Sequence, residues 1–197
     1  MVISDQHIKE RIADGRLENP LGLKFSPAIE DYQFGGADID LRLGNDFKIF
    51  TDQVENYYLS SPIVRVYQEN YEQDLENLIE NRHVSDDEEI IIDPYSMVLG
   101  ITQEMVTIPE DVFGVLDGRS RLGRVGISVH TTACGIKPGY HGKIVLEIFN
   151  HGIFRVALKP GMMVCSLRFH QVSSIVDRVY GDRKTDRYTH QDRDFQI

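Results

Sequence analysis

The sequence has few cysteines and no long apolar run. No apolar stretch approaches the roughly 20 residues that span a bilayer, and the N-terminal residues lack the basic-then-apolar layout of a signal peptide. We therefore expect a cytoplasmic protein with no membrane partner. Its two cysteines, Cys134 and Cys165, permit at most one disulfide. Because disulfides are rare in the reducing cytoplasm, we expect both thiols to be free.

The sequence also lacks the motifs with which proteins hold transition metals. Its seven histidines are scattered singly, and no HxE, CxxC or HExxH occurs. Zinc deaminases depend on such motifs, so we expect no protein-bound zinc. His130 lies near the centre of the most informative stretch, and we interpret it as a strand or core histidine. Ser120 has no neighbouring histidine, so the sequence indicates no nucleophilic triad, although a distant partner is left open.

Positive charge is scarce overall but concentrated in two places. The formal net charge is −10. This argues against a general nucleic-acid binder, since phosphate contacts need a basic face. Acidic residues gather at 69–80 and 86–89, whereas basic residues crowd 119–124 and the end of the chain. A cationic pocket in an acidic protein is typical of one that binds a small anionic ligand.

The most informative stretch begins with a glycine-punctuated, arginine-rich turn at 118–124. Its cationic and hydroxyl side chains suit a polyanion, and its glycines let backbone N–H groups approach phosphate oxygens. It is not a P-loop, because Arg124-Val125 follows in place of Lys-Ser or Lys-Thr. The alternative is a solvated surface turn, but three arginines around one serine favour the ligand.

An apolar strand near the end of this stretch carries one carboxylate. Glu147 lies between Leu146 and Ile148. Burial raises a carboxyl pKa towards neutrality, which suits proton transfer. If Val145, Glu147 and Phe149 share a face, the glutamate points where large apolar side chains point. A solvated sheet face is the alternative, and the residues alone leave the two open. An anion-binding turn followed by a proton donor predicts chemistry on a phosphorylated small molecule.

Many short apolar runs, separated by turn signals, predict a mainly β protein. Strands at this spacing indicate a β-sandwich, jelly roll or small barrel. A short helix is expected between Ser4 or Asp5 and Gly15, and an acidic amphipathic helix is expected as an insertion near 68–83. We expect one domain over 1–179 and a flexible arm over 180–197. The expected strands are 37–43, 47–50, 90–92, 97–101, 105–108, 114–116, 127–130, 144–149, 154–158 and 163–169.

Several motifs in order resemble a known family. GRSRLGRVG (118–126), HTTACGIKPGYHGKIVLEIFN (130–150) and LKPGMMVCSL (158–167) are similar to the core of the dCTP deaminases of the dUTPase-like superfamily. GADIDLRLG (36–44) is similar to the family's early strand. The resemblance covers nearly the whole chain except the acidic insertion. It implies a distorted β-barrel or jelly roll of the dUTPase-like type with a few short helices, and a homotrimer.

The resemblance also implies an activity. The family hydrolyses a cyclic amidine C–N bond, converting dCTP to dUTP and ammonia without zinc, which supplies dUTP for dUMP and dTTP synthesis. Glu147 would be the catalytic acid and base, Ser120 and the Ala133 backbone would hold the attacking water, and Arg124 would stabilise charge. Mg²⁺ would accompany the triphosphate, held mainly by phosphate oxygens. The phosphates would be held by the turn, through Arg119, Arg121, Leu122 and Gly123. Val145 and Leu146 would bind the edge of the cytosine beside Glu147, and Tyr180, Arg187 and Gln191 would close over the base and triphosphate from the C-terminal end. Lys137 would be a further substrate-binding residue.

The chain departs from the family pattern at three places. Lys137 stands where the family usually has an Asp that contacts the deoxyribose and, in dUTPases, activates water. Arg121 replaces a usual Ser, and Cys134-Gly135 matches the pair of neither monofunctional nor bifunctional members. Two alternatives therefore stay open: a bifunctional dCTP deaminase/dUTPase that yields dUMP and pyrophosphate, and a non-catalytic nucleotide-binding regulator on the same fold.

Overall fold

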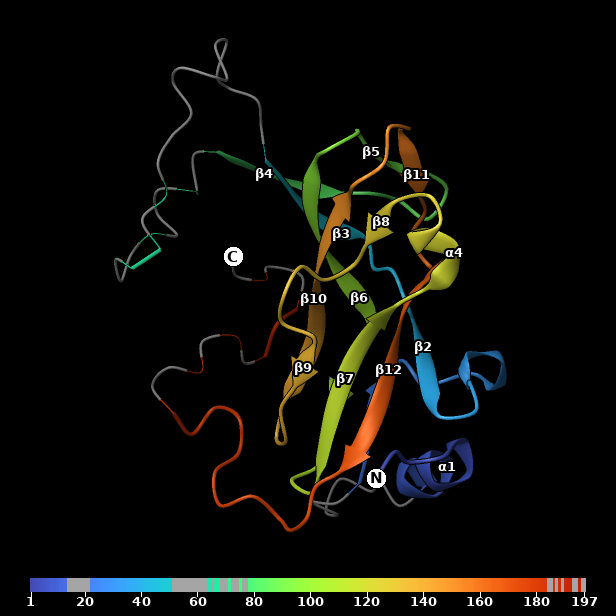
Figure 1. Ribbon diagram of the computed structural model, residues 1–197, viewed down its shortest axis with the longest axis vertical. Helices are drawn as coiled ribbons and strands as arrows, with labels where there is room; N and C mark the ends of the chain where they lie inside the picture. Colours follow the sequence, from blue (N-terminus) through green and yellow to red (C-terminus); the bar gives the residue numbers. More distant parts are fainter. Residues whose placement is uncertain are drawn as a thin grey trace.

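The computed structural model describes residues 1–13, 22–50, 64, 66–67, 71, 75, 78–183, 186, 188, 190–192 and 195. Antiparallel strands make up most of it, and short helices lie at its periphery (Figure 1). The elements are α1 (Asp5–Ala13), β1 (Lys24–Ser26), the 3₁₀ helix η1 (Asp31–Gln33), β2 (Asp38–Arg42), β3 (Asp46–Phe50), β4 (Ile79–His83), β5 (Ile90–Ile92), β6 (Met97–Thr107), β7 (Val112–Gly118), α4 (Ser120–Gly123), β8 (Ile127–Ser128), β9 (Gly135–Ile136), β10 (His141–Asn150), β11 (Val156–Leu158) and β12 (Met163–Gln171).

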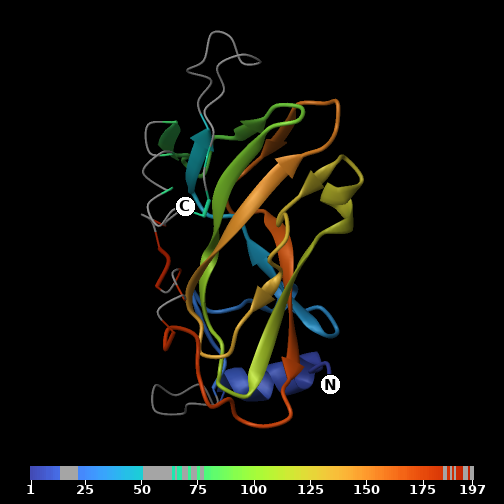
Figure 2. The same cartoon turned by 60° about the vertical axis from the view of Figure 1, so that its left-hand side comes forward.

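Two main sheets enclose one core. The six-stranded sheet has the order β4-β3-β6-β10-β8, with β1 also paired to β6, and the four-stranded sheet has the order β2-β12-β7-β9. A small sheet of β11 and β5 lies at one end, and α1 lies at the other (Figures 1 and 2). The core joins both main sheets, because Leu116 and Leu167 of one cluster with Leu146 and Ile148 of the other.

Strand β10 shows how the sequence sets the orientation of its side chains. Buried and half-buried residues alternate strictly along it. Ile144, Leu146 and Ile148 face the core, and each buried side chain of this size contributes about 1.5–3 kcal/mol. A slip of one residue would expose all three, so the register is strongly specified. Gly100 on β6 completes the fit, because a Cβ there would lie only 3.0 Å from Ile148 Cδ1.

The expected fold class is confirmed, with one correction. The structure is mainly β and consistent with a jelly roll, but its sheets are not closed into a barrel. In the described part of the chain, no ladder joins one main sheet to the other, and the link between them is an isolated bridge between Leu43, just after β2, and Thr102 of β6. The expected N-terminal helix is present as α1, although Gly15 lies outside the described residues. Among the described residues, no helix has the length and hydrophobicity needed to cross a membrane.

The helix expected near 68–83 is wrong for its last five residues. Tyr71 and Leu75 are helical, but Ile79–His83 form β4, which pairs with β3 along its whole length. Residues 68–70, 72–74 and 76–77 lie outside the described residues. The apolar spacing indicated a helix because Leu78 and Ile79 fit its period, whereas the remainder of β4 is polar and exposed, as suits an edge strand.

Candidate active site

The turn at 118–124, called here the cationic turn, follows directly from β7. Arg119 is extended, and the next four residues form the single helical turn α4. Leu122 is buried and anchors the turn to the core. The N–H groups of Leu122 and Gly123 both donate to the Arg119 carbonyl at 3.0 Å. These two amides were expected to bind phosphate, but both donate their hydrogen bonds within the turn itself.

A pocket beside the cationic turn adds groups from neighbouring strands. Its lining residues are Asp38, Asp40, Gly118, Arg119, Ser120, Arg121 and Ser166. The Asp40 carboxylate forms an ion pair with the Arg119 guanidinium. This pairing neutralises much of the charge on Arg119, whereas Arg121 and Arg124 form no ion pair with any other described residue. We therefore expect Arg121 and Arg124 to supply most of the attraction for an anion.

Sequence reasoning missed the two aspartates and Ser166. They reach the cationic turn because β12 pairs with β2 on one side and β7 on the other, so that Ser166 lies opposite both Asp40 and Asp117. The alternation of Asp38 and Asp40 along the early strand showed that both point to one face. The order of strands in the sheet is needed to show that this face of β2 lies beside the cationic turn.

Glu147 points away from the core, on the opposite face of the six-stranded sheet. Its Oε2 accepts a hydrogen bond from the Thr131 N–H at 2.8 Å, and its side chain is half-buried. It therefore shares a face with Val145 and Phe149, which resolves the question that the residues left open. We call this surface the outer face; by register its side chains are Lys48, Phe50, Met97, Leu99, Ile101, Val145, Glu147 and Phe149.

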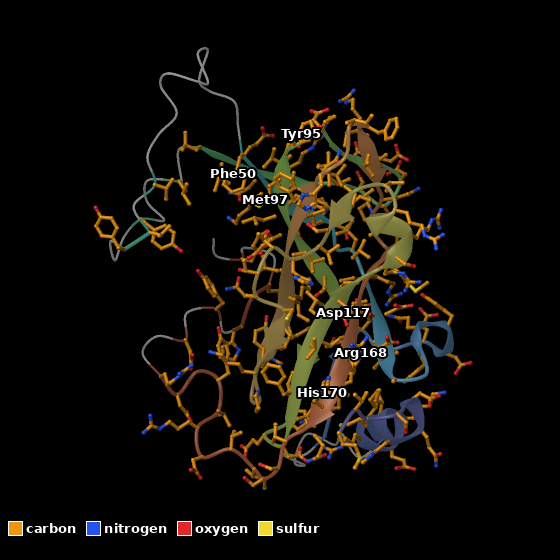
Figure 3. All side chains as sticks on the ribbon, in the orientation of Figure 1. Phe50, Tyr95, Met97, Asp117, Arg168 and His170 are labelled. Carbon is orange, nitrogen blue, oxygen red and sulfur yellow. The ribbon has the colours of Figure 1, made fainter. Side chains whose placement is uncertain are left out.

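The outer face is apolar around the carboxylate. Leu99 lies directly opposite Glu147 in the ladder and is only 6% exposed. Leu99 and Ile101 are covered by Phe195, and Phe50 and Met97 pack against the same cluster at the upper end of the sheet (Figure 3). An ionisable group in such surroundings is screened less by water than one on an open surface.

One edge of β10 is only partly paired. β6 runs along the other edge, while this one meets β8 at Phe149 and Asn150. It meets the C-terminal segment at His141 and Lys143, where His190 N–H donates to the His141 carbonyl and Lys143 N–H donates to the Gln191 carbonyl. Between these contacts, no described strand pairs with residues 144–148 on this edge. We call this stretch the open edge; its backbone groups can bind the polar edge of a planar ligand.

The loop that follows β8 brings further groups towards Glu147. It contains Thr131, whose amide holds the carboxylate, and Ala133, expected to position water. His130 precedes them, and its buried Nδ1 has no hydrogen-bond partner in the described part of the chain. His130 lies after β8 in a loop and is half-buried, so the expectation of a strand or core histidine is wrong.

The described residues from Val179 onwards, called here the C-terminal segment, contact the six-stranded sheet at the start of β10 and lie beside it (Figures 1 and 2). The Tyr180 ring packs against Tyr140 at 5.7 Å, and Gln191 is buried against Gly142. Gly142 has φ = 153°, and a Cβ there would lie 2.8 Å from Gln191 N. Arg187, expected to contact triphosphate, lies outside the described residues.

The two halves of the predicted site are not joined within one chain. No hydrogen bond or ion pair between described residues links Glu147 to the cationic turn; the turn follows β7 of the four-stranded sheet, whereas Glu147 lies on β10 of the six-stranded sheet. The described residues also contain no group of three or more His, Cys, Asp or Glu side chains arranged to hold a metal ion. A single chain therefore presents the cationic turn and, on another strand, a carboxylate beside the open edge.

These features define the class: a jelly-roll-like β protein with a cationic turn after β7 and a carboxylate on a long antiparallel strand. A family model described as dCTP deaminase-like matches residues 2–172. The chain belongs to this family.

Individual relatives agree with the family assignment. The chain is 42% identical over 166 residues to a dCTP deaminase of Shewanella frigidimarina, covering 84% of this chain and 82% of that protein. It is 37% identical over 193 residues to a dCTP deaminase of Photorhabdus laumondii, covering 97% and 94%. A solved dCTP deaminase from Agrobacterium tumefaciens has the same fold, with a TM-score of 0.60 and 20% identity; this chain is matched over 86% of its length and spans about half, 48%, of that one.

Proposed function

We propose that this chain is a dCTP deaminase, which converts dCTP and water to dUTP and ammonia and so supplies dUTP for dUMP and dTTP synthesis. Relatives named dCTP deaminase cover nearly the whole chain. The observation that carries the proposal is the state of Glu147: one carboxylate oxygen is held by Thr131, and the other accepts no hydrogen bond from any described residue. Because dCTP is an intracellular metabolite, we propose a cytoplasmic location.

Deamination requires water to add at C4 of cytosine, which is a poor electrophile when neutral. In our proposal Glu147 takes a proton from the water as its oxygen adds to C4, and passes that proton to N3 of the base. It then takes the proton of the new C4 hydroxyl and delivers it to the amine, so that the C4–N bond breaks, ammonia leaves and the C4 carbonyl forms. The Ser120 hydroxyl and the Ala133 backbone hold the water, and Arg124 stabilises the charge that develops. The open edge, with Val145 and Leu146, binds the base.

The triphosphate would be held by the cationic turn through Arg119, Arg121 and Arg124. Magnesium would enter with the substrate, bound mainly by phosphate oxygens, since hard cations prefer oxygen ligands. The carboxylates of Asp38 and Asp40 line the same pocket and are oxygen donors of the kind that Mg²⁺ accepts.

We further propose a homotrimer in which one copy supplies Glu147 and another the cationic turn. The separation of these groups within a chain supports this arrangement, as does the apolar outer face. Mixing a Glu147→Ala variant with an Arg124→Ala variant should restore part of the ammonia release, because some sites would then contain both native residues. Mass measurement in solution checks the trimer. No recovery after subunit exchange would argue against a shared site.

One assay separates the proposal from its alternatives. Purified protein with Mg²⁺ is given dCTP, dCMP, CTP or dUTP, and ammonia and pyrophosphate are measured. We expect ammonia from dCTP and no pyrophosphate, because Lys137 replaces the carboxylate that would activate a hydrolytic water. Pyrophosphate release would indicate the bifunctional enzyme. Nucleotide binding without ammonia would indicate the non-catalytic regulator and overturn the proposal.

A further inference from the structure

The C-terminal segment docks on the β9–β10 turn and the start of β10 through backbone contacts. These lead it towards the open edge. Further on, Phe195 is 2% exposed and covers Leu99, which lies opposite Glu147. The path of the C-terminal segment therefore determines which side chains cover the outer face next to Glu147. Three backbone hydrogen bonds contribute to the docking: Tyr180 N–H to the Pro138 carbonyl, His190 N–H to the His141 carbonyl, and Lys143 N–H to the Gln191 carbonyl. The Lys143 ammonium also pairs with Asp192 at 3.0 Å.

One carboxylate organises the middle of this segment. The Asp186 side chain is 2% exposed and accepts hydrogen bonds from the amides of Gly181 and Arg183 at 3.2 and 3.4 Å. It also accepts from the Arg183 guanidinium at 3.1 Å. Burial opposes its charge, but the hydrogen bonds from Arg183 and Gly181 outweigh burial and lower the pKa of Asp186. Asp186 is therefore an ion at neutral pH, and these three contacts lie within the segment itself.

Lys137 supplies the contact from the body of the protein. Its ammonium lies 3.5 Å from Asp186 Oδ1, and it also lies 5.2 Å from the centre of the Tyr180 ring, within cation–π range. The Tyr180 hydroxyl in turn accepts a hydrogen bond from the Tyr188 amide at 3.3 Å. Lys137 thus contacts the segment at two points separated along the chain.

We propose that Lys137 and Asp186 form a charged clamp that sets the course of the C-terminal segment, and that Lys137 is a positioning residue for the reaction. Lys137 then acts through the segment and not by touching the nucleotide. This proposal rests on the proposed function only where its readout is deamination. The clamp itself can be tested without turnover.

A double-mutant cycle tests the clamp. Lys137→Glu sets two carboxylates against each other, and like charges at this distance disfavour the docked segment. We expect the KM for dCTP to rise about tenfold with kcat within about threefold. Asp186→Asn keeps an oxygen acceptor for the Gly181 and Arg183 amides, so we expect a rise of only about threefold. The double variant should resemble Asp186→Asn, because it removes the repulsion. Additive effects, about thirtyfold together, would mean that Lys137 contacts the nucleotide directly and would overturn the clamp.

Hydrogen exchange gives the readout that is independent of activity. The amides of Lys143 and His190 make the docking bonds, so both should exchange faster in Lys137→Glu and recover in the double variant. Lys159→Glu is the matched control, because it makes the same charge change at an exposed position before β12 and should alter neither exchange nor KM. Unchanged exchange in Lys137→Glu would refute the clamp. If exchange recovers in the double variant but the wild-type chain releases no ammonia from dCTP, the clamp stands and only the deaminase assignment is refuted.

Discussion

Two glutamates on adjacent strands of the same sheet have very different surroundings. Glu104 on β6 is 0% exposed and accepts hydrogen bonds from Gln33 Nε2 at 3.0 Å, the Arg42 amide at 2.8 Å and Arg42 Nε at 2.6 Å. Glu147 on β10 is half-buried and accepts one, from the Thr131 amide. Glu104 joins η1 and β2 to β6, whereas one oxygen of Glu147 accepts no hydrogen bond from the part of the chain that the structure describes.

The difference shows why one carboxylate is structural and the other suits catalysis. Burial disfavours the charge on Arg42, but its hydrogen bond to Glu104 and their attraction outweigh this and raise the pKa of Arg42. Three donors from two other elements fix the Glu104 carboxylate in place, so its lone pairs are committed to structural contacts. A carboxylate with a single fixed donor keeps its orientation yet retains lone pairs for water or a base.

The largest effect is expected from removing the carboxylate that we propose as the proton carrier. Glu147→Ala should reduce ammonia release from dCTP by at least about 10³-fold, since general acid–base catalysis contributes on the order of 10²–10⁴. Nucleotide affinity should change by less than about tenfold, because the phosphates are bound elsewhere. Steady-state kinetics and calorimetry give the two quantities. Retained turnover would show that Glu147 is not the proton carrier.

Removing the charge from the structural glutamate should instead affect folding. In Glu104→Gln the amide nitrogen would face groups that only donate hydrogen bonds, and Arg42 would lose its buried counter-charge. We expect the free energy of unfolding to fall by about 3 kcal/mol. Urea denaturation measures this change, and kcat per folded molecule should stay within about twofold. A loss of turnover without a loss of stability would break the contrast between the two glutamates.

Deleting residues 180–197 should have an intermediate effect. The deletion removes Phe195 from the outer face and Tyr180 from Tyr140, but it leaves both main sheets intact. We expect KM for dCTP to rise about tenfold and kcat to fall, with cooperative unfolding retained. Unchanged kinetics would show that the C-terminal segment plays no part in the reaction.

The smallest effect is expected from a third carboxylate, which resembles Glu104 in its partners. Asp111 binds Arg11 of α1 at 2.8 Å and Gln171 of β12 at 2.9 Å. Burial opposes its charge, but these hydrogen bonds outweigh burial and lower its pKa. Its contribution is therefore present above the unfolded-state pKa of about 3.9 and is lost as pH falls through the folded-state value.

The corresponding variant is Asp111→Asn. At pH 7 it should destabilise the fold by about 1 kcal/mol, and the difference from wild type should shrink below about pH 4. Thermal unfolding across this pH range checks the sign. A difference that grows on acidification would contradict the assignment of Asp111 as a stabilising anion.

The parts of the site that are contiguous in sequence could be predicted from it. A carboxylate in an apolar strand marks Glu147, and the cationic turn lies within seven consecutive residues. The pairing of Asp40 with Arg119 could not be predicted, because it depends on β12 lying between β2 and β7. The use of the Leu122 amide inside the turn was missed for a similar reason, since a sequence does not show which N–H groups a turn consumes.

The fold was predictable to a similar extent. The alternation of apolar and polar residues indicated most strands. β4 was missed because Leu78 and Ile79, where the preceding segment meets the strand, fit a helical period, and because its partner β3 lies far away in the sequence. The division into two main sheets depends on which strands pair with each other, and short apolar runs in the sequence do not specify that pairing.

Gly142 has a consequence well beyond its own position. The end of the chain can run beside β10 only because one carbon atom is missing there, almost fifty residues earlier in the sequence than its neighbour Gln191. A side chain at position 142 would collide with the backbone of Gln191 and displace the chain end outwards. A substitution at this one position would therefore loosen the attachment of the terminus without removing any of its own side-chain contacts.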